Sequence, residues 1–317
     1  MPMRIDCMRN HPSRGKPIAR GEGGRGCGLL PAFVMPSQLS RAHRPSSPRE
    51  KSLVWWKQDA NDGLAEGVIM YMHVFSCRVF TRELSYFIAK SKNVVDVTFL
   101  PQGLHEAPKV LNSELQASIA RFREECDSWR RRRRPDYLAL CFGLCSDSIV
   151  GIEAIDVPIV VPRVDDCVGI YLGSEERYLE YFNKYKGTFW AFPSWAESSP
   201  STDADYLDIM RAEYLKRYDG DEDLVEDMME LELDMTANYS NVGYITSPLA
   251  VDPEGSREHA VRYARDHNWN LIEVEGDLSL MEQLLNGPWD EDKFLVVPPG
   301  YRIAAAPGIE KVRAVKA

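Results

Sequence analysis

The sequence predicts an α/β protein with mostly parallel sheets flanked by helices, arranged as one or two Rossmann-like lobes. Short apolar runs alternate with longer amphipathic stretches from about residue 69 to the end of the chain. This alternation is typical of crossover connections, which join parallel strands. The run DYLALCFG at 136–143 is apolar at nearly every position, as expected of a central parallel strand that is covered on both faces.

Residues 1–68 differ in composition from the rest of the chain. They are rich in Gly, Pro, Ser and Arg, show no hydrophobic periodicity, and carry 11 Lys and Arg against 6 Asp and Glu. Such a segment buries too little apolar surface to offset its ordering entropy. We expect it to be disordered, or to be an upstream extension from a mis-assigned start codon. A basic arm for a partner is the alternative interpretation.

The α/β domain covers residues 69–317 and begins with a predicted lobe at 69–196. The run 67–77 predicts a strand, and 81–92 predicts a helix with Thr81 as its N-cap. A second strand follows at 94–101, where β-branched residues alternate with others.

A long amphipathic helix is predicted at 113–134, with Leu115, Ile119 and Phe122 on one face. Its last turn carries the run WRRRRRP at 129–135. Cations are favoured at a helix C-terminus by the helix dipole, and proline stops the helix. A solvated helix end is therefore the better explanation of this run, and phosphate or nucleic-acid binding is the weaker one.

The remaining elements are predicted from the same patterns. The first lobe continues with three further elements: strands at 136–143 and 157–163, and a helix at 174–185 with Ser174 as its N-cap. A helical connection at 197–238 follows, acidic throughout and broken near Gly220. The second lobe at 239–317 is predicted to contain strands at 241–248, 269–277 and 293–303, and helices at 256–268 and 278–287, the last ended by Gly287.

Charge and hydropathy exclude several classes of protein. The net charge is −10, and residues 69–317 carry 27 Lys and Arg against 42 Asp and Glu, which argues against a nucleic-acid surface. No run approaches the roughly 18 apolar residues of a membrane helix. No secretory leader pattern is found. We therefore expect a cytoplasmic protein with reduced thiols, whose partner is a small molecule or a protein.

Three cysteines lie at or shortly after the ends of predicted strands, namely Cys77, Cys145 and Cys167, and His105 lies in the loop after another strand. Ligands of parallel α/β sheets bind outside the carboxyl ends of the strands, so we expect these four side chains to meet at one edge. Three thiolates and an imidazole suit zinc, or an iron–sulfur cluster with one open iron.

Charged residues accompany Cys167 in the stretch VPRVDDC. Asp166, and Asp165 beside it, are candidates to orient a metal ligand or to act as acid or base. Arg163 is a candidate clamp for an anionic substrate. We therefore predict catalytic roles for His105, Asp166 and Arg163.

The alternative interpretation of the cysteines is packing. Free cysteine is among the most buried residue types and often behaves as a small hydrophobe. Packing is the better explanation for Cys141, inside an apolar strand, and for Cys126, on a helix. For the three cysteines that follow strands, spacing alone leaves both interpretations open.

The stretches GLHEAP, FGLCSDSIVG, VPRVDDCVGIYLGSEERYLEYF and GTFWAFPSW resemble the bacterial and archaeal family known as domain of unknown function 1638. The resemblance spans about residues 72–303, and this chain has Asp165 where many relatives have histidine. The motifs of the family fall on Cys77, His105, Cys145 and Cys167. The resemblance implies that the three cysteines act together. It also implies a neighbourhood of corrinoid-dependent methyltransferases in one-carbon, methylamine or betaine metabolism.

Two functional hypotheses follow. The first is a metal–thiolate protein of one-carbon metabolism, in which Cys77, Cys145, Cys167 and His105 hold zinc or an iron–sulfur cluster. The second is a non-catalytic accessory protein whose cysteines are structural. In that case the acidic helical surface binds a corrinoid or a methyltransferase partner.

Overall fold

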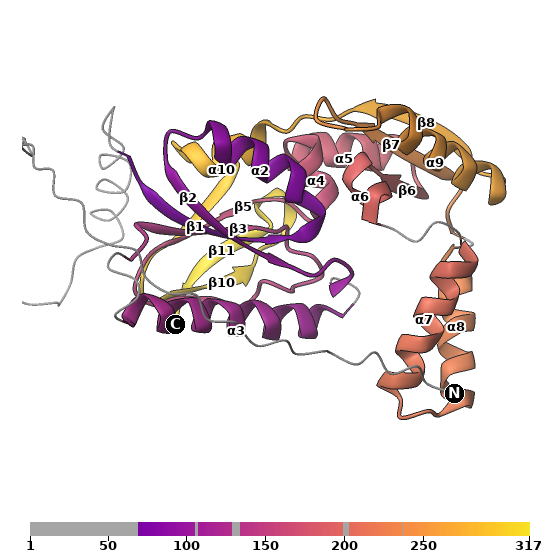
Figure 1. Ribbon diagram of the computed structural model, residues 1–317, viewed down its shortest axis with the longest axis horizontal. Coiled ribbons are helices and arrows are strands. Elements are labelled where there is room, and N and C mark those ends of the chain that lie inside the picture. Colours follow the sequence, from indigo (N-terminus) through magenta and orange to yellow (C-terminus); the bar gives the residue numbers. More distant parts are fainter. Residues whose placement is uncertain (1–68, 105–106, 129–133, 199–202, 237) are drawn as a thin grey trace, which may run out of the picture. The chain divides into compact units, whose positions relative to one another are not determined.

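The computed structural model describes residues 69–104, 107–128, 134–198, 203–236 and 238–317 (Figure 1). The expectations for residues 1–68, for His105 and for most of the arginine run at 129–135 fall outside these ranges.

A five-stranded sheet, called sheet A here, forms the centre of the α/β fold. Its strands, in spatial order, are β2 (Val94–Leu100), β1 (Tyr71–Cys77), β3 (Tyr137–Cys141), β5 (Ile159–Pro162) and β9 (Phe294–Val297). The first four are parallel to one another, and β9 pairs antiparallel with β5. The predicted α/β class with a mostly parallel sheet is therefore confirmed.

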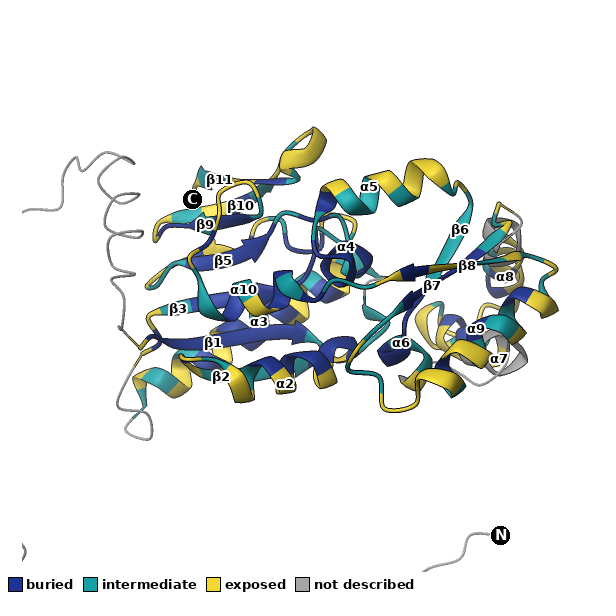
Figure 2. Ribbon diagram, turned by 90° about the horizontal axis from the view of Figure 1, so that it is seen from above, coloured by how far each residue is buried: buried dark blue, intermediate teal, exposed yellow. Residues whose placement is uncertain are grey.

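Helices cover both faces of sheet A. On one face lies α3 (Pro108–Asp127), which buries Leu115, Ile119 and Phe122 as its pattern predicted. On the other face lie α2 (Thr81–Lys90) and α10 (Ser279–Asn286). Figure 2 shows the consequence: the central strands are buried, whereas the helices keep one exposed side.

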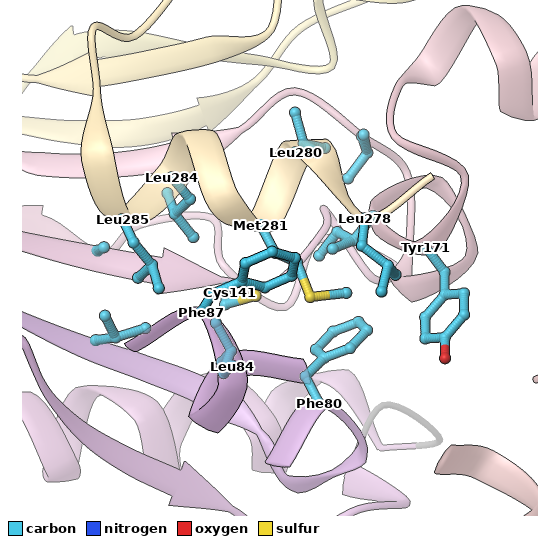
Figure 3. Packing of buried hydrophobic residues seen from close by; sticks show 14 of the residues in the cluster. Phe80, Leu84, Phe87, Cys141, Tyr171, Leu278, Leu280, Met281, Leu284 and Leu285 are labelled. Carbon is cyan, nitrogen blue, oxygen red and sulfur yellow. The ribbon is translucent and has the colours of Figure 1, made fainter. Parts of the chain in front are cut away.

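The core between sheet A and its second helical layer contains Cys141. Figure 3 shows this thiol among Leu84 and Phe87 of α2 and Met281 of α10. Cys141 is fully buried, and the prediction that it is a packing residue is confirmed.

A second parallel sheet, sheet C, contains β6 (Thr188–Ala191), β7 (Asn241–Thr246) and β8 (Asn270–Glu275), with β7 in the middle. Helix α9 (Pro253–Asp266) packs on β7 and β8. The sheets do not follow the predicted lobes of 69–196 and 239–317. Strand β6 from the first lobe belongs to sheet C, and β9 from the second belongs to sheet A, because strand pairing joins segments that are distant in sequence.

A small antiparallel sheet, sheet B, combines the C-terminus with the middle of the chain. It contains β4 (Glu153–Ala154), β10 (Tyr301–Ala305) and β11 (Val312–Lys316), with β10 in the middle. The sequence predicted one strand over 293–303, which is wrong. A turn ends β9, and there the Tyr301 amide donates to the Pro298 carbonyl at 3.1 Å. Gly300 has a φ of +83°, a conformation that favours glycine.

The shorter helices are η1 (Arg78–Phe80), α4 (Cys167–Leu172), α5 (Glu175–Lys184), α6 (Pro193–Ser198) and η3 (Gly308–Glu310). Ser174 caps α5 by accepting from the Arg177 amide, and Gly287 ends α10; both predictions are confirmed. The predicted N-cap at Thr81 is wrong. Helix η1 leads directly into α2, and the Thr81 hydroxyl instead donates to the Arg78 carbonyl.

The acidic stretch forms two helices, α7 (Asp203–Arg217) and α8 (Glu222–Thr236). They pack on each other through a small core of their own, made of Met210, Tyr214, Val225 and Met229. The predicted break near Gly220 is confirmed, since Gly220 has a φ of +82° between the helices. Across the described ranges, no helix has the length and apolar character that crossing a bilayer requires.

Candidate functional site: a thiol cluster at the carboxyl edge of sheet A

Three cysteines lie at or after the carboxyl ends of three adjacent parallel strands, at the same edge of sheet A. Cys77 is the last residue of β1, Cys145 follows the end of β3, and Cys167 begins α4 after β5. Strands β1, β3 and β5 are neighbours in the sheet and run in the same direction. The topology therefore gathers the residues as the sequence predicted for strand-end side chains.

The three thiols lie close enough to affect one another electrostatically. Burial raises the pKa of Cys167 well above its ordinary value, and the charge of Asp166 raises it further, as do Cys145 and Cys77. Burial also raises the pKa of Cys145, with Asp166 and Cys77 adding to the effect. For Cys77, burial raises the pKa and a hydrogen bond with the Val79 backbone opposes it. The three thiols are thus half-buried and within electrostatic range of one another, with Cys167 packed against the core that contains α2 and α10 and Cys145 against the core under α3.

The arrangement is not a preassembled metal centre. Within the part of the chain that the structure describes, no three His, Cys, Asp or Glu side chains stand close enough to bind one ion together. His105, the predicted fourth ligand, lies outside those residues. Metal ligation by Cys77, Cys145, Cys167 and His105 thus stays a prediction.

The loop that carries Cys145 has a strained backbone. Cys145, Ser146 and Asp147 have φ values of +46°, +56° and +67°, in the left-handed region that costs L-residues about 1–2 kcal/mol each. Such strain persists only where the surrounding structure determines it, and it concentrates at functional sites.

Contacts with the loop after β5 hold the strained segment in place. The Leu144 amide donates to the Val164 carbonyl at 2.9 Å, and the Cys145 amide donates to the Asp165 carbonyl at 2.7 Å. A Cβ atom on Gly143 would lie 2.6 Å from the Cα of Asp166. Only glycine therefore allows this approach, which fixes the loops of Cys145 and Cys167 against each other.

Asp166 lies between the thiols and helix α5. As the N-cap of α4 it accepts from the amides of Val168 and Gly169, at 2.8 and 3.3 Å. The hydroxyl of Tyr178 donates to its other oxygen at 3.3 Å. Burial raises the pKa of Asp166, and these three hydrogen bonds oppose the rise. Tyr178 reaches the site from α5 and was not among the residues predicted from sequence.

A partly buried ion network lies beside the thiol cluster and was also missed by sequence reasoning. The Lys311 Nζ lies 2.8 Å from an oxygen of Asp165 and 3.0 Å from an oxygen of Glu175. The second oxygen of Glu175 accepts from the Asp165 amide at 2.9 Å. Lys311 lies directly before β11, 146 residues from Asp165 in the sequence, so no local pattern could reveal this contact.

Arg163 is engaged by backbone carbonyl groups. Its Nε donates to the Glu291 carbonyl at 2.8 Å, and its Nη1 donates to the carbonyls of Glu310 and Val312. These bonds tie the end of β5 to β11 and to the segment before β9. The predicted role as an anion clamp stays a prediction, with Nε and Nη1 already engaged in structural hydrogen bonds.

Comparison with known proteins gives a family and no annotated relative. A family model described as protein of unknown function, DUF1638, matches residues 99–285. No curated protein and no solved structure matches the chain. The matched span includes Cys145, Asp166 and Cys167 and begins after Cys77. Because it covers more than half of the 317 residues, the chain belongs to the DUF1638 family.

Proposed function

We propose that this protein binds a thiophilic metal centre, zinc or an iron–sulfur cluster, through Cys77, Cys145 and Cys167. The observation that carries the proposal is the gathering of three half-buried thiols from three adjacent parallel strands at one sheet edge. Ligands at this edge are the rule in parallel α/β folds.

The electrostatics of the cluster support a cationic occupant. Burial and the nearby carboxylate of Asp166 both disfavour the thiolate forms of Cys145 and Cys167. A divalent ion reverses this balance, since metal ligation deprotonates thiols and releases their protons. Metal uptake would draw the three side chains together from their positions in the structure, and the Cys145 loop would keep its anchorage to the loop after β5.

The proposed chemistry follows from the number of ligands. Three thiolates leave one position for His105, a substrate or water, which is the arrangement of a catalytic zinc ion or a cluster with an open iron. Zinc in this setting would activate a thiol or another methyl acceptor. A cluster would supply redox or Lewis-acid chemistry. Asp166 would orient the ligands through its fixed hydrogen bonds. A role in corrinoid-dependent one-carbon metabolism belongs to the proposal through the family resemblance.

Anaerobic purification with metal and sulfide analysis tests the proposal, together with an absorption spectrum. We expect about one metal centre per chain, and loss of most of it in each of Cys77→Ala, Cys145→Ala and Cys167→Ala. Cys126→Ala is the matched control, because Cys126 lies on α3, away from this edge, and should keep the metal. Cysteine variants that retain full metal content would rule out thiolate ligation.

The accessory hypothesis has one observation in its favour, the helical hairpin of α7 and α8. Residues 203–236 carry 13 Asp and Glu against 3 Lys and Arg, and the two helices share a core of their own. Such a surface favours a basic partner. This hypothesis predicts a metal-free protein, and binding of a methyltransferase component that weakens steeply with added salt.

A further inference from the structure

A polar cleft opens between the edge strand β2 and helix α3, on the face of sheet A opposite α2 and α10. Its volume is about 310 Å³. The polar residues that line it are His73, Asp96, Thr98, Ser118, Arg121 and Glu125. Strand β2 is at the edge of sheet A, and Figure 1 shows α3 below it.

The polar character of the cleft breaks the pattern of the surrounding core. In the register of β1 and β2, His73 pairs with Asp96, and Phe75 pairs with Thr98. Paired residues of parallel strands project to the same face, so Asp96, Thr98 and His73 face α3 where apolar side chains would normally pack. The intervening residue Val97 packs on the opposite, apolar core instead.

A buried histidine forms the floor of the cleft. His73 is 3% exposed, its ring stacks on Phe122 with centroids 3.8 Å apart, and its Nε2 lies 2.9 Å from the Thr98 hydroxyl. Ser118 beside it is also buried. Burying polar side chains is unfavourable unless they are hydrogen-bonded, so this floor is a specific arrangement of polar groups.

The rim of the cleft carries charges of both signs. Arg121 is exposed and donates from Nη2 to the Ser118 hydroxyl at 2.9 Å. Asp96, which accepts from the Tyr71 hydroxyl, and Glu125 supply two carboxylates. A simple anion would meet these carboxylates, and a simple cation would meet the guanidinium. A molecule with a negative and a positive group can complement both.

We propose that this cleft binds a small zwitterion with the size and charges of a free amino acid. Its carboxylate would bind Arg121, its ammonium group would face Asp96 and Glu125, and the His73–Thr98 pair would form the floor. The volume lies at the lower end of the range for small-molecule sites. Cys77 lies four positions after His73 on β1, about 13 Å along the strand, so the site is independent of the proposed metal centre.

A thermal-shift screen of the full chain against the twenty free amino acids tests the proposal, followed by titration calorimetry on those that bind. We expect at least one to raise the melting temperature by about 5 °C at a hundredfold excess over its Kd. Arg121→Gln should weaken that binding at least tenfold. Arg123→Gln is the matched control: Arg123 lies on the same helix outside the cleft, paired with Asp156 at 2.7 Å, and the variant should bind normally.

Derivatives of the bound amino acid test the charges separately. Its methyl ester lacks the carboxylate and its N-acetyl form lacks the ammonium group, and each should bind at least tenfold more weakly. The proposal is overturned if no amino acid binds saturably, if Arg121→Gln binds like the unchanged protein, or if either derivative binds as tightly as the parent. None of these measurements depends on metal content, so failure here leaves the thiol cluster untouched.

Discussion

Single residues fix the carboxyl edge of sheet A through contacts between residues that are far apart in the sequence. Lys311 neutralises Asp165 and the buried Glu175, two residues that flank the segment carrying Cys167. Burial lowers the pKa of Lys311, but its hydrogen bonds with the two carboxylates outweigh this effect, so the pKa is raised overall. The position of the Cys167 loop therefore depends on a side chain from the C-terminal sheet.

Replacing Lys311 by methionine should strongly destabilise the protein. The Glu175 carboxylate would stay buried without its counter-charge. Removing one partner of a buried ion pair typically lowers the free energy of unfolding by about 3–5 kcal/mol. Urea denaturation measures the loss. The double variant Lys311→Met/Glu175→Gln should recover part of it, because the buried charge is then gone as well. A single-variant loss below about 1 kcal/mol would contradict the buried ion pair.

The buried thiol of Cys141 predicts a pH dependence of stability. Burial raises its pKa from 9.0 to about 12. Between pH 8 and pH 10 the unfolded chain ionises this thiol and the folded chain does not, so the unfolded state gains about 1.4 kcal/mol. The sign is a loss of stability as pH rises. The free energy of unfolding is measured for the unchanged protein and for Cys141→Ala at both pH values. From pH 8 to pH 10 the unchanged protein should lose about 1.4 kcal/mol more than the variant, which lacks the thiol. An unchanged difference would argue against a buried, protonated thiol.

Helix starts are fixed by local hydrogen bonds, which the sequence predicts in one case and misassigns in another. Ser174 accepts from the Arg177 amide and caps α5, whereas Thr81 begins α2 without capping it. Both positions show a hydroxyl before an amphipathic run. Only the structure shows that η1 leads directly into α2, so that Thr81 is already inside the helix and its hydroxyl donates to the Arg78 carbonyl.

This difference can be measured with a matched pair of alanine variants. Ser174→Ala should lower the free energy of unfolding by about 1 kcal/mol, the usual cost of losing an N-cap. Thr81→Ala, an exposed residue with no capping bond, should change it by less than about 0.5 kcal/mol. Equal effects of the two substitutions would mean that the caps are assigned incorrectly.

Across the whole molecule, charge is concentrated in one helical hairpin. Residues 203–236 carry a net charge of −10, from 13 acidic and 3 basic side chains, which equals the net charge of the entire chain. The core between α7 and α8 is formed by their own side chains, and an Arg211–Glu226 ion pair at 2.7 Å joins them. The hairpin is thus stabilised mainly from within.

Removal of residues 203–236, with a short Gly-Ser linker in their place, should leave the rest of the fold intact. We expect unchanged tryptophan bands in the near-ultraviolet circular dichroism spectrum, because the deleted segment contains no tryptophan, and a much weaker retention on an anion exchanger, since the net charge becomes zero. If this variant keeps its metal content, metal binding by the thiol cluster does not depend on the acidic hairpin. Loss of the cooperative unfolding transition would show that the hairpin supports the two sheets.

Much of the candidate site could be predicted from strand-end residues alone. Cys77, Cys145 and Cys167 each follow an apolar run, and the rule that parallel strands end at one edge brings them together. Tyr178 and Lys311 could not be predicted, because they reach the same edge from a helix and from a hairpin distant in sequence. The left-handed turn at Cys145 could not be predicted either, because Cys and Ser seldom adopt a positive φ and only Asp147 in this turn is of a residue type enriched there.

The sequence by itself determined the α/β class, the alternation of elements and the face of α3, because these depend on hydrophobic periodicity within a few turns of chain. The tertiary structure alone decided which strands share a sheet. Strand β6 belongs to sheet C and β9 belongs to sheet A, and the last predicted strand is in fact two strands, β9 and β10. It also placed His73 and Arg121 around one cleft. Strand pairing and side-chain contact join residues far apart in the chain, and no local pattern encodes which of several apolar runs will pair.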